Sequence, residues 1–224
     1  MSKKLEVQYW SDVLCVWAYV SQVRVDELKN NFSSDVELTN TYFPVFGAAL
    51  GKLDAMWADK GGRTAYSEHV RSVVGRFGHL TVTPDIWQVN APTSSLPAHL
   101  YICAAQYLEQ RGQLAPGSCA LLAWQLRSAF FAEGIDVSCR RHILDIAEQH
   151  GIAPSLLESA VDCGAAYALL SKQAANATDA GIKVSPTFSF NEGRQRLSGN
   201  VGYRIIEANI RELVEQPELR QSWC

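Results

Sequence analysis

The chain has 224 residues, of which 47% are hydrophobic, and a formal net charge of −3 at pH 7. This length and apolar content allow one large domain, or a small domain that carries an insertion, with a sizeable core. The slightly acidic balance and the lack of a Lys/Arg-rich run argue against a surface for phosphate backbones, so we expect no nucleic acid partner. No uninterrupted apolar stretch of about 18 residues occurs, so we expect no membrane-spanning helix.

The N-terminal residues do not resemble a secretion signal. Lys3 and Lys4 are followed by apolar residues that alternate with Glu6 and Gln8, so no continuous apolar segment forms. We therefore expect a cytoplasmic protein.

The cysteines show no metal-binding or redox pair spacing. None of the six lies in a C-x-x-C pair, and the five histidines share no ligand spacing with them. We expect no metal site, no disulfide framework and no tightly bound cofactor.

Three local patterns at the start of the chain predict a strand, a helix and a second strand. Apolar residues alternate over 5–11, recur at spacings of three to five over 15–28, and alternate again over 36–42. This order fits a βαβ unit with parallel strands. Cys15 lies at the predicted N-terminus of the helix.

The long middle of the chain is rich in helix-forming residues and lacks strand patterns. Prolines, glycines and apolar spacing predict helices over 63–76, 97–110, 116–132, 138–149, 154–161 and 165–180. Strand alternation returns at 187–190, and 194–197 can pair back on it as a hairpin. A last helix is predicted over 203–215, ended by Pro217. The order βαβ, helices, ββα predicts an α/β fold with a mixed four-stranded sheet.

Cys15 is the residue with the most suggestive context. Unpaired N–H groups and the helix dipole at its position stabilise an anion, so we expect a thiol pKa below about 8.5 and a reactive thiolate. The alternative is a buried thiol packed under Trp17. Trp10, Asp12, Trp17 and Tyr19 are close in sequence and could shape a pocket around the thiol, although the aromatic residues are equally well explained as core. A nearby Asp12 would oppose thiolate formation.

A second candidate segment is V-S-P-T-F at 184–188, where Pro186 comes just before a predicted strand. A cis peptide bond there would leave the backbone of Ser185 free to pair with a ligand, whereas a trans bond would make Pro186 an ordinary strand-opening proline.

The thiol at the start of the first helix and the V-S-P-T-F segment together resemble the DsbA family. More narrowly, they resemble its cytoplasmic branch of FrnE-like oxidoreductases, 2-hydroxychromene-2-carboxylate isomerases and kappa-class glutathione transferases. The resemblance spans the whole chain, including 128–138 and 181–200. It implies a thioredoxin fold formed by 1–45 and 181–224, with an all-helical insertion domain formed by 46–180.

The resemblance also implies roles for individual residues. Cys15 matches the nucleophilic cysteine, and Ser185 with Pro186 matches the cis-proline pair whose backbone binds a peptide or glutathione. Asn200 falls where glutathione-binding relatives contact the γ-glutamyl end. One departure is important: the dithiol members have C-P-x-C, and this chain has C-V-W-A, so Ala18 replaces the resolving cysteine.

Three functions remain open at this point. The first is a thiol–disulfide oxidoreductase that uses Cys15 alone on disulfides or glutathione mixed disulfides, with glutathione as a possible co-substrate. The second is a glutathione-dependent isomerase or transferase with a small aromatic substrate. The third is a binding protein that performs no chemistry. In each case the partner is a small thiol, disulfide or ligand, and a homodimer is compatible with all three.

Overall fold

The computed structural model describes residues 4–215 and contains one four-stranded sheet in the order β2-β1-β3-β4. The strands are β1 (Leu5–Ser11), β2 (Val36–Tyr42), β3 (Thr187–Phe190) and β4 (Gln195–Ser198). β1 pairs with β2 in parallel and with β3 antiparallel, and β3 and β4 form the predicted hairpin. The predicted mixed sheet and thioredoxin fold are confirmed. Residues 1–3 and 216–224 of the predicted thioredoxin domain, including Pro217, lie outside the described residues.

The first helical segment differs from the prediction. The expected single helix over 15–28 is two helices, α1 (Val16–Val20) and α2 (Gln22–Asn31). Ser21 lies between them with φ −87° and ψ −5° and ends α1 while it starts α2. Serine is a weak residue for a helix interior because its side chain competes for backbone hydrogen bonds, which accounts for a boundary that apolar spacing alone does not show.

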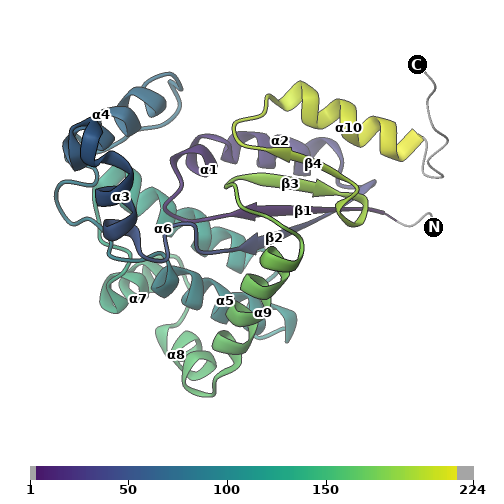
Figure 1. The fold of residues 1–224 in the computed structure, drawn as a ribbon. Coiled ribbons are helices and arrows are strands. Elements are labelled where there is room, and N and C mark those ends of the chain that lie inside the picture. Colours follow the sequence, from purple (N-terminus) through teal and green to yellow (C-terminus); the bar gives the residue numbers. More distant parts are fainter. Residues whose placement is uncertain (1–3, 216–224) are drawn as a thin grey trace.

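A helical insertion separates β2 from β3 (Figure 1). All six predicted helices are present, with ends within two residues of the expected ones. A helix at Ala49–Trp57 was not predicted. The helices and short 3-10 turn of the insertion are α3 (Ala49–Trp57), η1 (Ala58–Lys60), α4 (Gly62–Val74), α5 (Leu96–Gln110), α6 (Ser118–Glu133), α7 (Arg140–Gln149), α8 (Pro154–Asp162) and α9 (Ala165–Asp179).

Each half of the molecule has its own apolar core. The sheet core lies between the strands and the helices α2 and α10 (Tyr203–Glu215), and it includes Val7, Tyr9, Phe188, Phe190, Ile206 and Ile210. A larger cluster fills the helical insertion and extends to Cys15 and its neighbours at the end of β1. Cys15 therefore lies where the sheet half and the helical half meet. No helix within residues 4–215 is long and apolar enough to cross a membrane.

Candidate functional site

Cys15 lies just beyond the carboxyl end of β1, where it is the N-cap residue of α1 with an extended backbone (φ −84°, ψ 116°). Its side chain is buried, and its thiol donates a hydrogen bond to the carbonyl oxygen of Ser185 at 3.1 Å. The Ser185–Pro186 peptide bond is cis, as the family resemblance implies. The structure thus brings Cys15, Ser185 and Pro186 together from opposite ends of the chain.

The Ser185–Pro186 segment is anchored on both sides. The Ser185 hydroxyl accepts a hydrogen bond from the backbone N–H of Asp12 at 2.9 Å, and the Pro186 carbonyl accepts one from the N–H of Gly199 at 2.8 Å. The first contact joins the segment to the turn before Cys15, and the second joins it to the end of β4. Because both anchors are backbone groups of the sheet half, the carbonyl that faces the thiol has a fixed position.

The pKa of the Cys15 thiol differs in direction from the sequence-based expectation. Burial raises this pKa above its usual value, and the negative charge of Asp12 adds to the effect. Hydrogen bonds from the Ser185 side chain and from the backbone at Ala18 and Trp17 act in the opposite direction but are smaller. The prediction of a lowered pKa is therefore wrong. α1 has five residues, and the loss of hydration around a buried sulfur outweighs what its N-terminus provides.

The carboxylate of Asp12 is fully buried and accepts three hydrogen bonds. One oxygen, Oδ1, accepts from the N–H of Leu14 at 2.8 Å. The other, Oδ2, accepts from the N–H of Phe46 and from the hydroxyl of Ser95, each at 2.8 Å. Phe46 and Ser95 belong to the helical insertion, so this one side chain connects the insertion to the turn that carries Cys15.

Two further buried polar residues of the insertion contact the turn before Cys15. His99 of α5 accepts a hydrogen bond at Nε2 from the N–H of Val13 at 3.1 Å and lies 3.6 Å from Asp12 Oδ1. Burial lowers the pKa of His99, which is consistent with a neutral imidazole that accepts at Nε2. Arg127 of α6 donates to the Ser11 hydroxyl at 3.2 Å and to the Asp12 carbonyl at 3.4 Å. We call Ser11, Asp12, Ser95, His99 and Arg127 the Asp12 cluster.

Sequence reasoning did not find this cluster. Asp12 was singled out for its charge, and His99 was considered only as one of five histidines without a metal-ligand spacing. The hydrogen bonds to Asp12 come from positions 34 and 83 residues away in the chain, and no periodicity connects such positions. The one available signal was an acidic residue directly after a strand and three positions before the cysteine.

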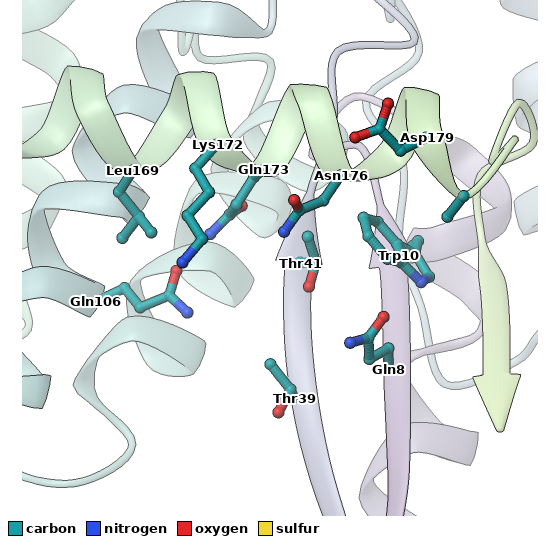
Figure 2. A pocket seen from close by; sticks show the side chains of 11 residues that line it. Gln8, Trp10, Thr39, Thr41, Gln106, Leu169, Lys172, Gln173, Asn176 and Asp179 are labelled. Atoms are coloured by element: carbon teal, nitrogen blue, oxygen red, sulfur yellow. The ribbon is translucent and has the colours of Figure 1, made fainter. Parts of the chain in front are cut away.

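The remaining predicted site residues lie in different surroundings. Trp17, on α1, is half-buried beside the core of the helical half. Asn200 is exposed and accepts a hydrogen bond from the Arg24 guanidinium of α2. Trp10 packs on the α9 side of the sheet and lines a polar groove of about 400 Å³ (Figure 2). Cys15 is not among the residues that line this groove, so the role predicted for Trp10 in binding at the thiol gains no support from its position.

Within residues 4–215, no group of three His, Cys, Asp or Glu side chains is arranged to hold a metal ion. The five cysteines in this range are all free.

A thioredoxin fold with a helical insertion, in which a cysteine at the start of the first helix faces a cis-proline segment, defines a class of thiol-dependent proteins. The family model of the DSBA-like thioredoxin domain matches residues 6–211, and the chain belongs to this family. No curated protein matches the sequence.

Solved structures show the same fold at low sequence identity. A protein from Nitrosomonas europaea, described as a candidate protein disulfide isomerase, has a TM-score of 0.76 and 14% identity, with 96% of this chain and 99% of that chain covered. The cytosolic disulfide reductase DsbM from Pseudomonas aeruginosa has a TM-score of 0.64 and 17% identity over 92% and 99% of the two chains, and it has also been solved with glutathione. A 2-hydroxychromene-2-carboxylate isomerase has a TM-score of 0.64 and 15% identity over 95% and 97%.

Proposed function

We propose that the protein is a thiol–disulfide oxidoreductase that uses Cys15 as its single nucleophilic sulfur and glutathione as its co-substrate. The observation that carries this proposal is the thiol of Cys15 held 3.1 Å from the carbonyl oxygen of Ser185, beside Pro186. In this arrangement the backbone of Ser185 can pair with an extended substrate while the sulfur attacks it. Family membership supports the same reaction class.

The reaction has two thiol–disulfide exchanges. The Cys15 thiolate attacks the glutathione sulfur of a mixed disulfide, which releases the substrate thiol and leaves glutathione bonded to Cys15. The thiolate of a second glutathione then attacks that bond, which forms oxidised glutathione and restores Cys15. In sum, one reduced glutathione is consumed: it joins the glutathione unit taken from the mixed disulfide to form oxidised glutathione, and the substrate sulfur is released as a thiol.

Ala18 is the reason for assigning the second step to an external thiol. It occupies the position of the resolving cysteine of dithiol relatives, and it is fully buried. Cys103 and Cys119 lie in α5 and α6, where burial raises the pKa of both thiols, to about 12 for Cys103. Burial also raises the pKa of Cys15, so the assignment rests on position: among the cysteines of residues 4–215, Cys15 is the one whose thiol is hydrogen-bonded to Ser185, beside Pro186.

A second candidate function is a glutathione-dependent isomerase or transferase. The observation in its favour is that Cys15 is a buried, protonated hydrogen-bond donor. Such a thiol can donate to the sulfur of a bound glutathione instead of forming a bond to it. In either function, we propose that Ser185 and Pro186 bind the glutathione backbone, with Trp17 and Asn200 at the edges of the site.

We also propose that the protein acts in the cytoplasm, where glutathione is abundant and reduced. A similar solved structure is described as a cytosolic disulfide reductase.

The first experiment measures glutathione adducts by intact mass after the reduced protein is incubated with oxidised glutathione across pH. We expect an adduct that is lost in Cys15→Ser and is removed by added reduced glutathione. Cys163→Ser is the matched control, because Cys163 is exposed and far from the site in sequence. Tight binding of reduced glutathione without any Cys15 adduct would favour the isomerase or transferase function.

A second experiment restores the missing thiol. In Ala18→Cys, the introduced sulfur lies one helical turn from Cys15 and can attack the adduct, so we expect the adduct to disappear without added glutathione. Ala18→Ser is the control for the change in volume and polarity. An adduct that persists equally in both variants would show that a sulfur at position 18 cannot reach the glutathione adduct on Cys15.

A further inference from the structure

We propose that Asp12 is a positioning residue for Cys15, whose buried carboxylate fixes the turn that carries the thiol. This deepens the proposed function, because it concerns the sulfur on which that function rests. Three sets of observations carry it: the contacts of the Asp12 backbone, the contacts of its carboxylate, and the charges around the thiol.

The backbone of Asp12 touches both segments of the candidate site. Its N–H donates to the Ser185 hydroxyl at 2.9 Å, and its carbonyl accepts from the N–H of Cys15 at 3.2 Å. A rotation of the Asp12 peptide units would therefore move the thiol and the Ser185–Pro186 segment relative to each other.

The carboxylate of Asp12 fixes that backbone conformation. Its contact with the N–H of Leu14 closes a tight turn just before Cys15, and its contacts with Phe46 and Ser95 fasten the turn to the insertion. The three donors are neutral groups on three different parts of the chain. An amide at this position has a single acceptor oxygen, so it cannot satisfy donors on both sides of the carboxylate.

These neutral donors stabilise the negative charge of Asp12 but do not cancel it. The nearby cation, Arg127, directs its guanidinium at the Ser11 hydroxyl and at the carbonyl of Asp12, and no ion pair between Arg127 and the carboxylate is found in the described part of the chain. A buried charge that is not paired acts strongly on nearby groups, because little water lies between them.

The other titratable groups around the thiol do not carry a competing negative charge. Burial raises the pKa of Tyr9 on β1 and of Tyr66 on α4, so both phenols are neutral near pH 7. His99 on α5 is neutral because burial lowers its pKa, and Arg127 on α6 is positive. In the described residues, Asp12 is therefore the anion whose charge acts on Cys15, and it adds to the effect of burial on the pKa of the thiol.

The test is the pH dependence of Cys15 alkylation by iodoacetamide in Asp12→Asn, followed by peptide mass analysis. We expect the apparent pKa of Cys15 to fall, because a nearby like charge is removed. Asp145→Asn, on the exposed face of α7, is the matched control and should leave the profile unchanged. An unchanged or higher pKa in a folded Asp12→Asn protein would overturn the electrostatic part of the proposal.

The positioning role of Asp12 is tested by a second measurement, the rate at which Cys15 reacts with oxidised glutathione. Above the pKa, where the thiol is fully ionised, we expect Asp12→Asn to react with oxidised glutathione at least tenfold more slowly than wild type, while its alkylation rate is maintained. Equal rates with oxidised glutathione in both proteins would refute the positioning role. If the wild type itself forms no glutathione adduct, the proposed function fails, and the alkylation profile still tests the charge effect.

Ser95→Ala keeps the proposal testable if Asp12→Asn does not fold. This variant removes one donor to Asp12 and keeps the charge. Since the hydroxyl dipole partly offsets that charge, we expect the pKa of Cys15 to stay the same or to rise. A lower pKa in Ser95→Ala would contradict the proposal.

Discussion

Two buried regions meet along β1, and they are held together by different forces. In the sheet core, Val7 and Tyr9 pack against Phe188 and Phe190 beneath α10, so the main stabilising term is apolar area removed from water. At the carboxyl end of the same strand, the Asp12 cluster is equally buried but joins its parts by hydrogen bonds. Apolar packing has little directional preference, whereas each donor in the Asp12 cluster needs its acceptor at one distance and angle.

The comparison has a consequence for how each region tolerates change. A core side chain can be replaced by another of similar volume at modest cost, but a buried polar group that loses its partner costs its full desolvation energy. The contacts beside Cys15 are therefore the ones that tolerate a conservative replacement least.

The largest effect is expected in the sheet core. Phe190→Ala removes a fully buried aromatic ring and should lower the free energy of unfolding by about 3–5 kcal/mol. Phe190→Leu should cost clearly less, because it retains much of the volume. Urea denaturation followed by circular dichroism measures both. Val23→Ala, at an exposed position of α2, is the control and should change stability by less than about 0.5 kcal/mol.

The next largest effect is expected for Arg127 in the Asp12 cluster. Arg127→Ala leaves the acceptors on Ser11 and Asp12 without their donor and should cost about 2–3 kcal/mol in urea denaturation. Arg127→Lys should rescue little, because an ammonium cannot reproduce the fork of a guanidinium. Full recovery with lysine would mean that charge alone matters here, and Arg141→Ala, at an exposed position of α7, is the control.

His99 gives the Asp12 cluster a pH dependence that the sheet core lacks. Its pKa in the folded protein is below the usual 6.5, so the unfolded chain binds more protons, and stability decreases as the pH falls below about 6.5. The slope contributed by this one site is at most about 1.4 kcal/mol per pH unit. Thermal or urea unfolding between pH 7 and 5 should show a steeper loss of stability in wild type and in His79→Gln, where an exposed histidine is replaced, than in His99→Gln. The slope that remains in His99→Gln is expected from His69, whose pKa burial also lowers. The same slope in His99→Gln would assign the effect to another group.

The smallest effects are expected in the polar groove beside Trp10, which has hydrogen bonds like the Asp12 cluster but is open to water. Figure 2 shows the side chains that line it. Gln173 is buried and accepts from the N–H of Tyr42 at 2.8 Å, so Gln173→Ala should cost about 1 kcal/mol. Lys172→Ala, at its exposed neighbour, should remain within about 0.5 kcal/mol. Equal costs for the two variants in urea denaturation would show that the buried hydrogen bond of Gln173 contributes no measurable stability.

The contrast between the apolar sheet core and the hydrogen-bonded Asp12 cluster also explains which features the sequence could predict. The sheet core follows from alternation in β1 and β3, and the insertion helices follow from apolar spacing with proline and glycine at their ends. The helix at Ala49–Trp57 was missed because Gly51 interrupts a short segment that follows Pro44 and Gly47. At the candidate site, motif resemblance indicated Cys15, Ser185 and Pro186, which do meet. The partners of Asp12 could not be predicted, because they depend on how two halves of the chain pack.

Burial also explains why the predicted direction of the Cys15 pKa shift was wrong. A sequence shows that Cys15 precedes a helix, and this favours a thiolate, but it does not show how much water the folded chain leaves around the sulfur. Trp10 illustrates the same limit: it is five residues from Cys15 in sequence, yet it lines a groove to which Cys15 does not contribute.

The position of the insertion has a consequence for the order of folding. The central strand β1 pairs with β3, so that Tyr9 lies opposite Phe188, and closing this pair joins residues separated by most of the chain. The entropic cost of such a closure falls if the intervening segment is already compact. Topologies with many distant contacts also fold slowly. In the helical insertion α5 packs against α6, α8 and α9, and an insertion that is compact before the sheet closes lowers this cost. The candidate site is complete once β3 pairs with β1.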